Sequence, residues 1–261
     1  NFKWNTNFVL SYYRNYYVKR DANYVLGINE TQRQDVNDMW QYVVDGMIPA
    51  GNPNAGALKF KDLNGYLRDD SGNIVMVNGK PAYSGSPDGM IDEADMIYKG
   101  NSTPIPFSLN NSFEFGKFDV NVYFYGMFNN WQNNSTYTMF AGNLQNVALY
   151  GENTLKSLAN RWSYDNLNSS IPSIFAHVES TAAQRNGYYL EKAWFLRCDN
   201  VSLGYTFKTK KSNKYFSSLR VYAAARNLFV ITPYSGSDPE TDSQAAYPNS
   251  RTYTFGIDIT F

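Results

Sequence analysis

The chain has very few of the residues that build most catalytic and metal centres. Its 261 residues include one histidine, His177, and one cysteine, Cys198. A lone histidine cannot form a multi-histidine metal site, and a lone cysteine cannot form a disulfide within the chain. His177 lies in a polar stretch without a neighbouring nucleophile, and the sequence contains no GxSxG, HExxH, CxxC or Walker-type motif. The sequence therefore predicts that the protein is not an enzyme.

The sequence also lacks a net charge and a long apolar run. It contains 23 Lys and Arg against 23 Asp and Glu, so the formal net charge is +0. This balance argues against a basic surface that would bind nucleic acid. No apolar run approaches the roughly 20 residues that a membrane-spanning helix needs, and no N-terminal signal segment is visible. We therefore predict no nucleic-acid partner and no helical membrane anchor.

Aromatic residues, by contrast, are abundant. They make up 17% of the chain, with 22 Tyr and 17 Phe, while charged residues make up only 18%. Asn, Ser, Thr and Gly carry much of the remaining polarity. A transmembrane β-barrel has this composition because apolar and polar residues alternate between its outer and inner faces. A secreted, aromatic-rich β-sandwich that binds carbohydrate has a similar one, so composition alone leaves both open.

The last residues of the chain alternate most regularly. Because side chains alternate across a strand, one face of this segment is apolar and the other is polar. Soluble proteins avoid ending on an uncovered aromatic strand, whereas a membrane barrel pairs its last strand with its first. The apolar face carries Tyr253, Phe255, Ile257, Ile259 and the terminal Phe261.

Six segments alternate in this way. They predict membrane strands near residues 2–19, 105–116, 118–130, 188–207, 219–232 and 250–261. The dipeptide Gly116-Lys117 predicts a tight hairpin turn between the second and third strands. In the fourth segment the charged residues Arg197 and Asp199 take apolar positions. We interpret this irregularity as a β-bulge or as the point where the strand leaves the membrane.

The connections between these segments differ sharply in length. Short connections alternate with long ones over residues 20–104, 131–187 and 233–249. Outer-membrane barrels have short periplasmic turns and long extracellular loops. The predicted fold class is therefore an all-β, transmembrane antiparallel β-barrel with long extracellular loops and a periplasmic C-terminus. Since about eight strands are needed to close a filled barrel, we expect the six strands to pair with a remaining part of the same barrel.

Short motifs in the sequence follow one another in the order found in one transporter family. They are Asp62-Leu63-Asn64-Gly65, Asp88-Gly89-Met90-Ile91-Asp92 with Asp95, Arg161-Trp162, Tyr189-Leu190, Asn200-Val201-Ser202-Leu203-Gly204-Tyr205, Leu219-Arg220-Val221-Tyr222, Arg226-Asn227-Leu228-Phe229, Tyr234-Ser235-Gly236, Asp238-Pro239-Glu240, Tyr247-Pro248 and Arg251-Thr252-Tyr253-Thr254-Phe255-Gly256. As an ordered set, they resemble the C-terminal portion of a SusC/RagA-family TonB-dependent outer-membrane transporter.

The resemblance implies a bacterial outer-membrane barrel of about 22 strands. It also implies a SusD-like surface lipoprotein as partner, coupling to TonB through an N-terminal plug that this sequence lacks, and import of glycans or oligopeptides. The terminal strand with Phe261 resembles the signal that the outer-membrane assembly machinery recognises. A secreted carbohydrate-binding β-sandwich and a passive porin are the alternatives.

Two acidic segments predict a split calcium-binding loop. An EF-hand loop places oxygen ligands at positions 1, 3, 5, 7, 9 and 12. Residues 65–87 interrupt the pattern, and their turn signals predict a small hairpin that could bring the two halves together. The alternative is a pair of solvated acidic turns. The candidate ligands of a structural Ca²⁺ are Asp62, Asn64, Asp88, the Met90 carbonyl, Asp92 and Asp95.

Aromatic residues in the predicted extracellular loops are candidates for contact with substrate or partner. Exposed rings stack on sugar faces, and aromatic residues are enriched in protein interfaces. The alternative is that they form small cores inside the loops or an aromatic girdle. The candidates are Trp40, Tyr42, Trp131, Tyr137, Trp162 and Tyr164.

Overall fold

The computed structural model describes most of the chain. The described residues are 2–20, 33–134, 137, 154–173, 187–208, 216–241, 247 and 249–261. His177 lies outside them. Among the described residues, no helix is long and apolar enough to cross a membrane.

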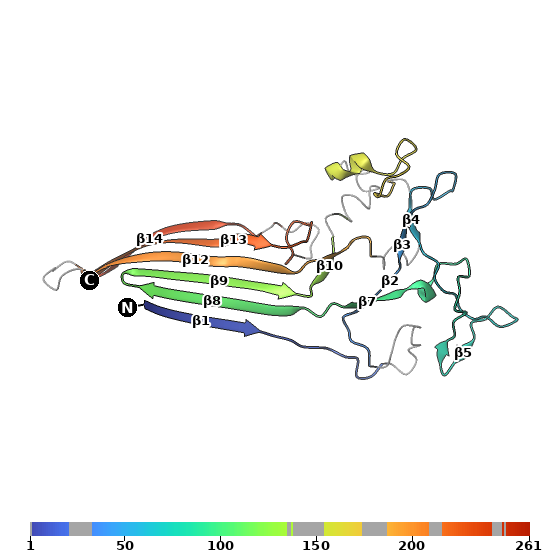
Figure 1. Cartoon of the computed structure of the whole chain (residues 1–261), viewed down its shortest axis with the longest axis horizontal. Helices are drawn as coiled ribbons and strands as arrows, with labels where there is room; N and C mark the ends of the chain where they lie inside the picture. The colour runs from blue at the N-terminus through green and yellow to red at the C-terminus, as the bar shows by residue number, and fades with distance from the viewer. Residues whose placement is uncertain are drawn as a thin grey trace.

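A single antiparallel sheet of six strands forms the main body of the structure (Figure 1). The strands follow one another across the sheet in sequence order, and β1 and β14 form its two open edges. The prediction of an all-β antiparallel fold is confirmed. In order, the strands are β1 (Phe2–Leu10), β8 (Ile105–Phe115), β9 (Phe118–Phe128), β12 (Phe195–Lys208), β13 (Ser218–Ile231) and β14 (Thr252–Thr260).

The register gives the sheet two different faces. One row of directly paired residues crosses all six strands as Trp4, Phe113, Val120, Leu203, Ala223 and Phe255. The adjacent row crosses them as Lys3, Glu114, Asp119, Gly204, Tyr222 and Gly256. Successive side chains point to opposite faces, so the first row lies on an apolar outer face and the second on a polar inner face.

Two of the predicted strand ranges need correction. The strand predicted over residues 2–19 ends at Leu10, which pairs with Phe107. It ends there because its partner strand β8 begins at Ile105, so almost no residues of β8 remain for β1 to pair with. The strand predicted over residues 188–207 is two strands. The short strand β11 (Leu190–Lys192) pairs with β10 (Trp131–Asn133) outside the main sheet, and β12 begins only at Phe195.

The predicted irregularity near Arg197 is a β-bulge. The register shifts between Cys198 and Asn200 where β12 pairs with β9 and again where it pairs with β13. On β13, Asn227 has a positive φ of 49° at the same level. A bulge changes which face the following residues occupy. It therefore allows Arg197 and Asn200 to share the inner face while Val201 and Leu203 face outward.

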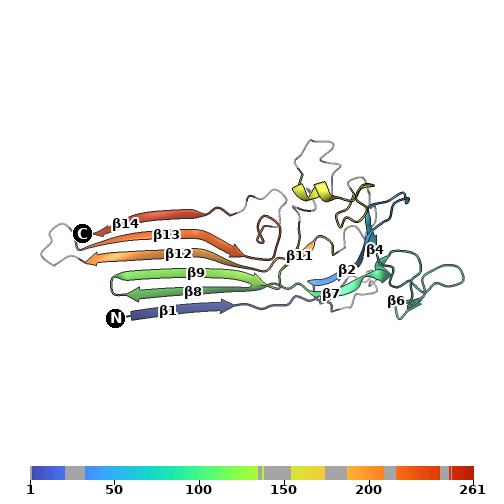
Figure 2. The same ribbon diagram turned by 45° about the horizontal axis from the view of Figure 1, so that its top comes forward.

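Connections of different length lie at opposite ends of the sheet (Figure 2). The β8–β9 turn is Gly116-Lys117, with a φ of 63° at Gly116. A two-residue hairpin turn of this kind favours glycine because its first position needs a positive φ. The paired ends of β12 and β13, Lys208 and Ser218, lie at the same end, as do both chain termini. The three long connections lie at the other end.

The β1–β8 connection contains most of the additional structure at the loop end. Its described residues form three two-stranded ribbons, and Tyr42, Leu58 and Phe60 form a small core that packs against Val44 and Met47. The ribbons pair β2 (Asp38–Gln41) with β7 (Ile97–Asn101), β3 (Val44–Met47) with β4 (Leu58–Phe60), and β5 (Met76–Val77) with β6 (Lys80–Pro81). The described loop residues include the 3-10 helices η1 (Glu93–Asp95) and, in the β9–β12 connection, η3 (Lys156–Asn160).

An ion-pair network crosses the inner face near the short turns. The Arg220 guanidinium donates hydrogen bonds to both carboxylate oxygens of Asp119, at 2.6 and 3.0 Å, and one of 3.1 Å to Asp258. Arg220 lies on β13 and Asp119 on β9, so the contact passes over Gly204 of β12. A Cβ atom at Gly204 would lie 2.5 Å from Asp119 Oδ1 and 2.6 Å from Arg220 Nη2. Glycine is therefore required at this crossing.

We predict that Gly204→Val destabilises the barrel, because the added side chain must displace Arg220 from Asp119. Overpacking of this kind costs about 1–3 kcal/mol. The temperature at which the full-length protein loses its compact, heat-modifiable form in detergent should fall by several degrees. Ser202→Ala, on the same strand and face, is the matched control and should change it little. Equal unfolding temperatures for the two variants would contradict the requirement for glycine at position 204.

Candidate functional site

A buried arginine ties the β13–β14 connection to the inner face of the sheet. The Arg197 side chain is 2% exposed and forms an ion pair of 2.7 Å with Asp238. It also forms an ion pair with Glu240 and donates a hydrogen bond to Asn227 Oδ1. Asp238 and Glu240 belong to the connection, whereas Arg197 belongs to β12. Because a buried charge is costly unless it is paired, these contacts fix the connection against the sheet.

Further hydrogen bonds extend this anchor. The Tyr125 hydroxyl on β9 donates to Glu240, 2.9 Å from each carboxylate oxygen. The Asn249 side-chain amide donates to Asp238 at 3.3 Å. Asn227 in turn donates to the backbone carbonyl of Asn249 at 2.6 Å. The contacts join three strands to both ends of one connection, so the side chains around them are held in place.

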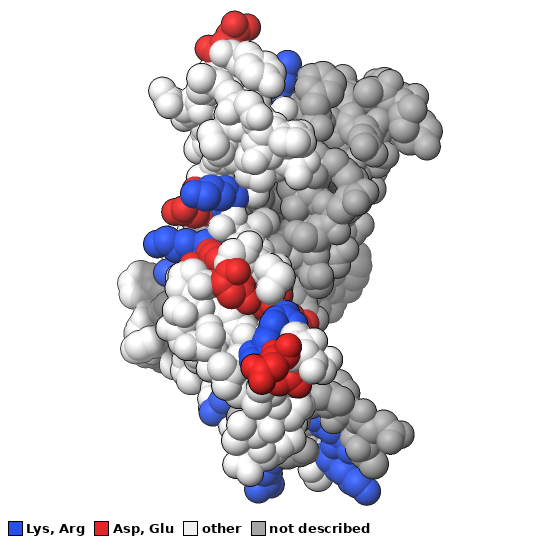
Figure 3. All heavy atoms as spheres, turned by 90° about the vertical axis from the view of Figure 1, so that its right-hand side faces the viewer, with Lys and Arg blue, Asp and Glu red and all other residues white. Residues whose placement is uncertain are grey.

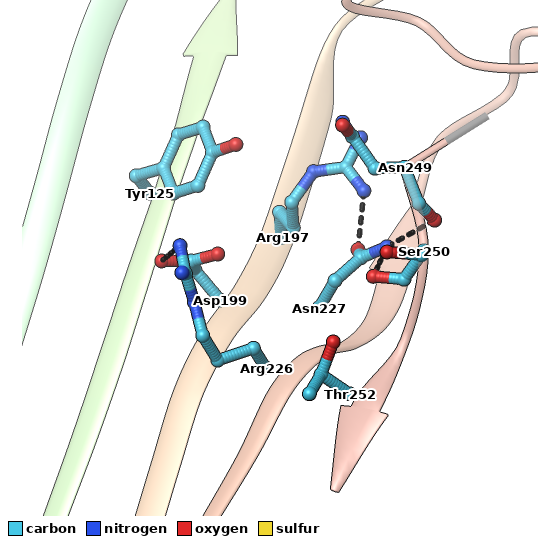
Figure 4. Close-up of a pocket in the computed structure, with 8 residues that line it drawn as sticks. All are labelled: Tyr125, Arg197, Asp199, Arg226, Asn227, Asn249, Ser250 and Thr252. Carbon is cyan, nitrogen blue, oxygen red and sulfur yellow. Dashed lines mark hydrogen bonds and ion pairs between the residues drawn. The ribbon is translucent and has the colours of Figure 1, made fainter. Parts of the chain in front are cut away.

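A polar cavity of about 270 Å³ lies beside the anchor. Figure 4 shows side chains from β9, β12, β13 and the start of β14 converging on it. A second cavity of about 260 Å³ lies on the other side of Tyr125 and Glu240, which line it together with Tyr123, Phe107 and Met127. The first cavity is lined by Tyr125, Arg197, Asp199, Arg226, Asn227, Asn249, Ser250 and Thr252.

The two arginines of the first cavity differ in their surroundings. Arg197 is buried and paired with two carboxylates, whereas the Arg226 side chain is 72% exposed. Arg226 Nη2 lies 4.0 Å from a carboxylate oxygen of Asp199, which is 24% exposed. An exposed pair at this distance contributes little to stability. Both groups keep hydrogen-bonding capacity toward the cavity. Its lining residues offer hydrogen-bond donors and acceptors, so the site is suited to binding a polar ligand.

The residues predicted to bind calcium are brought close together in the structure. The inserted residues fold back as expected, with Tyr66 bridged to Tyr83 and Ser84 N–H donating to the Gly65 carbonyl. Asp62 then accepts hydrogen bonds from the backbone N–H groups of Asp88 and Gly89, which lie in the second half of the loop. The split loop is thus joined into one unit.

The oxygens of this loop, however, are engaged by backbone groups. Asp95 Oδ1 accepts from Leu63 and Asn64, and its Oδ2 accepts from Asp92. Burial raises the pKa of Asp92, the Ala94 N–H opposes that shift, and the charges of Asp88 and Asp95 add to it. In the described part of the chain, no three His, Cys, Asp or Glu side chains are grouped so that they could hold a metal ion. Ca²⁺ binding would therefore require these carboxylates to give up their backbone N–H partners, and it stays a prediction.

The aromatic candidates fall into two groups. Tyr42 and Trp162 are only 3% and 4% exposed, so their buried rings do not suit contact with a substrate. Tyr42 packs in the loop core, and Trp162 covers Gly56, where a Cβ would lie 2.4 Å from the indole ring. Tyr164, by contrast, is 74% exposed. The remaining three are partly exposed and contact neighbouring side chains, Trp40 on Tyr98, Trp131 on Lys192 and Tyr137 on Tyr188.

The terminal-strand residues lie where the alternation predicts. Tyr253, Phe255, Ile257 and Ile259 are exposed on the outer face of β14, and Phe261 follows the end of the strand with 90% of its surface exposed. This strand pairs with β13 on one side only. Its free edge is available to a further strand.

Sequence reasoning missed the Arg197 anchor and the cavity beside it. Two signals pointed toward them. Arg197 and Asp199 interrupt the apolar alternation of their strand, and Asp238-Pro239-Glu240 is a compact acidic motif in a connection. Neither signal indicates that the two segments meet, because 41 residues separate Arg197 from Asp238.

Comparisons with known proteins show which class of protein the chain is similar to. No protein-family model matches the chain. Curated proteins with similar sequences are TonB-dependent receptors, and similar solved structures include those of a RagAB transporter. The resemblance to SusC/RagA-type TonB-dependent transporters is thereby confirmed. These relatives are receptors and transporters rather than enzymes, and they point to an outer membrane crossed by β-strands.

Among the individual relatives is the TonB-dependent receptor SusC of Bacteroides thetaiotaomicron. It is 29% identical over 194 residues, which cover 70% of this chain and 18% of SusC. TonB-dependent receptor P26 of Formosa agariphila is 26% identical over 297 residues and matches 100% of this chain. The chain spans 18% and 27% of the length of these two relatives.

The solved structures show the same fold. A structure of the RagAB peptide transporter matches 88% of this chain with a TM-score of 0.59 and 21% identity, over 23% of its own length. The RagAB peptide importer in its open-open state matches 99% of this chain, also with a TM-score of 0.59, at 22% identity and over 27% of its length.

We predict that Arg197→Met releases the β13–β14 connection, because it leaves Asp238 and Glu240 without their cation. Removing one partner of a buried ion pair costs about 3–5 kcal/mol. Proteolysis of the connection in the folded transporter should become faster, and the unfolding temperature should fall. The double variant Arg197→Met/Asp238→Asn should recover part of the loss. Arg226→Gln, at the exposed arginine, is the control. If it accelerated proteolysis and lowered the unfolding temperature as much as Arg197→Met, the proposed anchoring role of Arg197 would be wrong.

We predict that Ca²⁺ binds the loop formed by Asp62 and residues 88–95, with the carboxylates exchanging their backbone N–H partners for the ion. Calorimetric titration of Ca²⁺ into chelator-treated transporter should give heat of binding and a higher unfolding temperature. Asp62→Asn with Asp92→Asn should remove both effects. Absence of heat and of stabilisation in the unmodified protein would end this prediction.

Proposed function

We propose that the chain forms part of a TonB-dependent outer-membrane importer that takes up oligomeric nutrients, glycans or oligopeptides, with a SusD-like surface lipoprotein. The single observation that supports this most strongly is the six-stranded antiparallel sheet with an exposed apolar outer face and a polar, ion-paired inner face. A barrel wall between lipid and an aqueous interior needs these two faces. The similarity to TonB-dependent receptors supports the same proposal.

In this proposal the parts of the chain have different roles. The sheet supplies barrel wall, and the long connections at one end face the outside of the cell, where they can contact substrate and lipoprotein. Figure 3 shows that the acidic and basic side chains of the described residues are interspersed on this face of the loop end. Such a surface does not select strongly charged partners through a long-range field. Coupling to TonB would use a plug region outside this chain.

The exposure of the outer face argues against the alternative of a secreted β-sandwich. A sandwich buries one face of each sheet against the other. Here Trp4 is 60% exposed and Phe255 83% exposed, and the apolar row between them is not covered by another sheet in the described part of the chain. A lipid environment would cover this face. The observation therefore favours a membrane barrel.

Energy dependence tests the proposed function against a passive porin. Cells carrying the full-length transporter should take up the nutrient only while the inner-membrane proton gradient and TonB are intact. Uptake should also depend on the lipoprotein partner. Uptake that continues without TonB would indicate a passive pore, and a protein that stays soluble without detergent would indicate a secreted domain.

We predict that deleting Phe261 lowers insertion into the outer membrane, because the terminal strand is proposed to carry the signal that the assembly machinery recognises. The fraction of full-length transporter in the heat-modifiable, membrane-embedded form should fall several-fold. Removing an exposed tyrosine elsewhere, as in Tyr164→Ala, is the control and should leave insertion unchanged. Normal insertion without Phe261 would count against this role.

A further inference from the structure

We propose that the inner-face cavity between Arg226 and Thr252 is a subsite for one uncharged, hydroxyl-rich unit of an oligosaccharide. This inference rests on the proposed transport function, and it selects neutral over acidic substrates. Four features of the cavity support this assignment, namely its hydrogen-bonding groups, its charge balance, the aromatic ring beside it and the rigidity of its walls.

The cavity presents donors and acceptors side by side. The Arg226 guanidinium can only donate hydrogen bonds, and the Asp199 carboxylate 4.0 Å away can only accept them. The hydroxyls of Ser250 and Thr252 line the same cavity and can do both. Neighbouring hydroxyl groups on a sugar ring each donate and accept. A pair of opposite groups at this spacing therefore matches two adjacent hydroxyls.

The charge balance of the cavity disfavours an acidic ligand. The lining contains two positive charges, those of Arg197 and Arg226, and one negative charge, that of Asp199. Asp238 and Glu240 pair with Arg197 from outside the lining. The Arg197 charge is already compensated by its two ion pairs. The remaining cation, Arg226, already has Asp199 beside it, so an anion entering the cavity would have to displace Asp199 from Arg226. A neutral ligand does not meet this obstacle.

An aromatic ring lies between this cavity and the next. Tyr125 lines both cavities, and its ring is stacked near that of Tyr123, with the ring centres 6.1 Å apart and the planes inclined by 27°. The bond from Tyr125 to Glu240 fixes the ring, so little conformational freedom is lost when a ligand packs on it. The apolar face of a sugar ring can pack on such a surface. The second cavity then provides room for a following unit.

The walls of the cavity are held in place before any ligand arrives. Asn227 adopts its positive φ and donates to the carbonyls of Asn249 and Ser250. These bonds fix the segment that carries Ser250 and Thr252 against the bulge that carries Asp199. Preorganised polar groups bind with a smaller entropic cost than mobile ones.

A binding experiment on the full-length transporter, purified with its lipoprotein in detergent, tests the subsite. The probes are hexamers of glucose, galactose, mannose and xylose, a galacturonate hexamer, and a set of unrelated hexapeptides. At least one neutral hexamer should bind more tightly than the galacturonate hexamer and the peptides. Arg226→Gln and Asp199→Asn should each weaken its binding by roughly tenfold, as expected for loss of a hydrogen bond to a charged group.

A control variant separates this effect from general damage to the barrel. Ser112→Ala changes a polar residue of the inner face away from the cavity and should leave binding unchanged. Three outcomes would overturn the subsite: no neutral hexamer binds, acidic or peptide probes bind better, or Arg226→Gln and Asp199→Asn leave binding unaltered. If the transporter still imports a substrate in a TonB-dependent manner, any of these outcomes refutes the subsite alone. Loss of TonB-dependent import in the unmodified protein would instead refute the proposed function.

Discussion

The pairing register of the six long strands is the constraint on which the rest of this structure depends. Side chains alternate with a period of two, so a slip of one residue in any pair would turn that strand's apolar residues toward the polar face. The same register sets Gly204 between Asp119 and Arg220, and it aligns Tyr125 with Arg197. Membrane face, ion network and cavity are thus consequences of one set of backbone hydrogen bonds.

The inner face carries two charge clusters with different surroundings. Near the short turns, Arg220 joins three strands in a partly exposed network. Near the loop end, Arg197 is buried and joins a strand to a connection. The first cluster supports the wall of the sheet, whereas the second positions a loop and, with it, one side of a cavity. Because the bulge between Cys198 and Asn200 lies next to the second cluster, the irregular part of the strand coincides with the candidate binding site.

Local sequence patterns were sufficient to predict the positions of the main strands and an irregularity near Arg197, but not the contacts between distant segments. Apolar and polar residues alternate within the sequence of each strand, and Arg197 and Asp199 mark the bulge because they interrupt this alternation. The pairing of Arg220 with Asp119 spans 101 residues, and it follows from strand order and register rather than from any local motif. For the same reason the burial of Tyr42 and Trp162 was not predicted. The end of β1 at Leu10 was missed because it depends on where its partner begins.

The antiparallel order of the sheet restricts the number of strands that can close it into a barrel. β1 runs from the short-turn end to the loop end, and β14 runs back, so the two edge strands point in opposite directions. A ring in which every neighbour is antiparallel must contain an even number of strands. Any strands that close this sheet in that way must also be even in number. The strand that joins β14 must run toward the long loops, and the strand that joins β1 must run away from them.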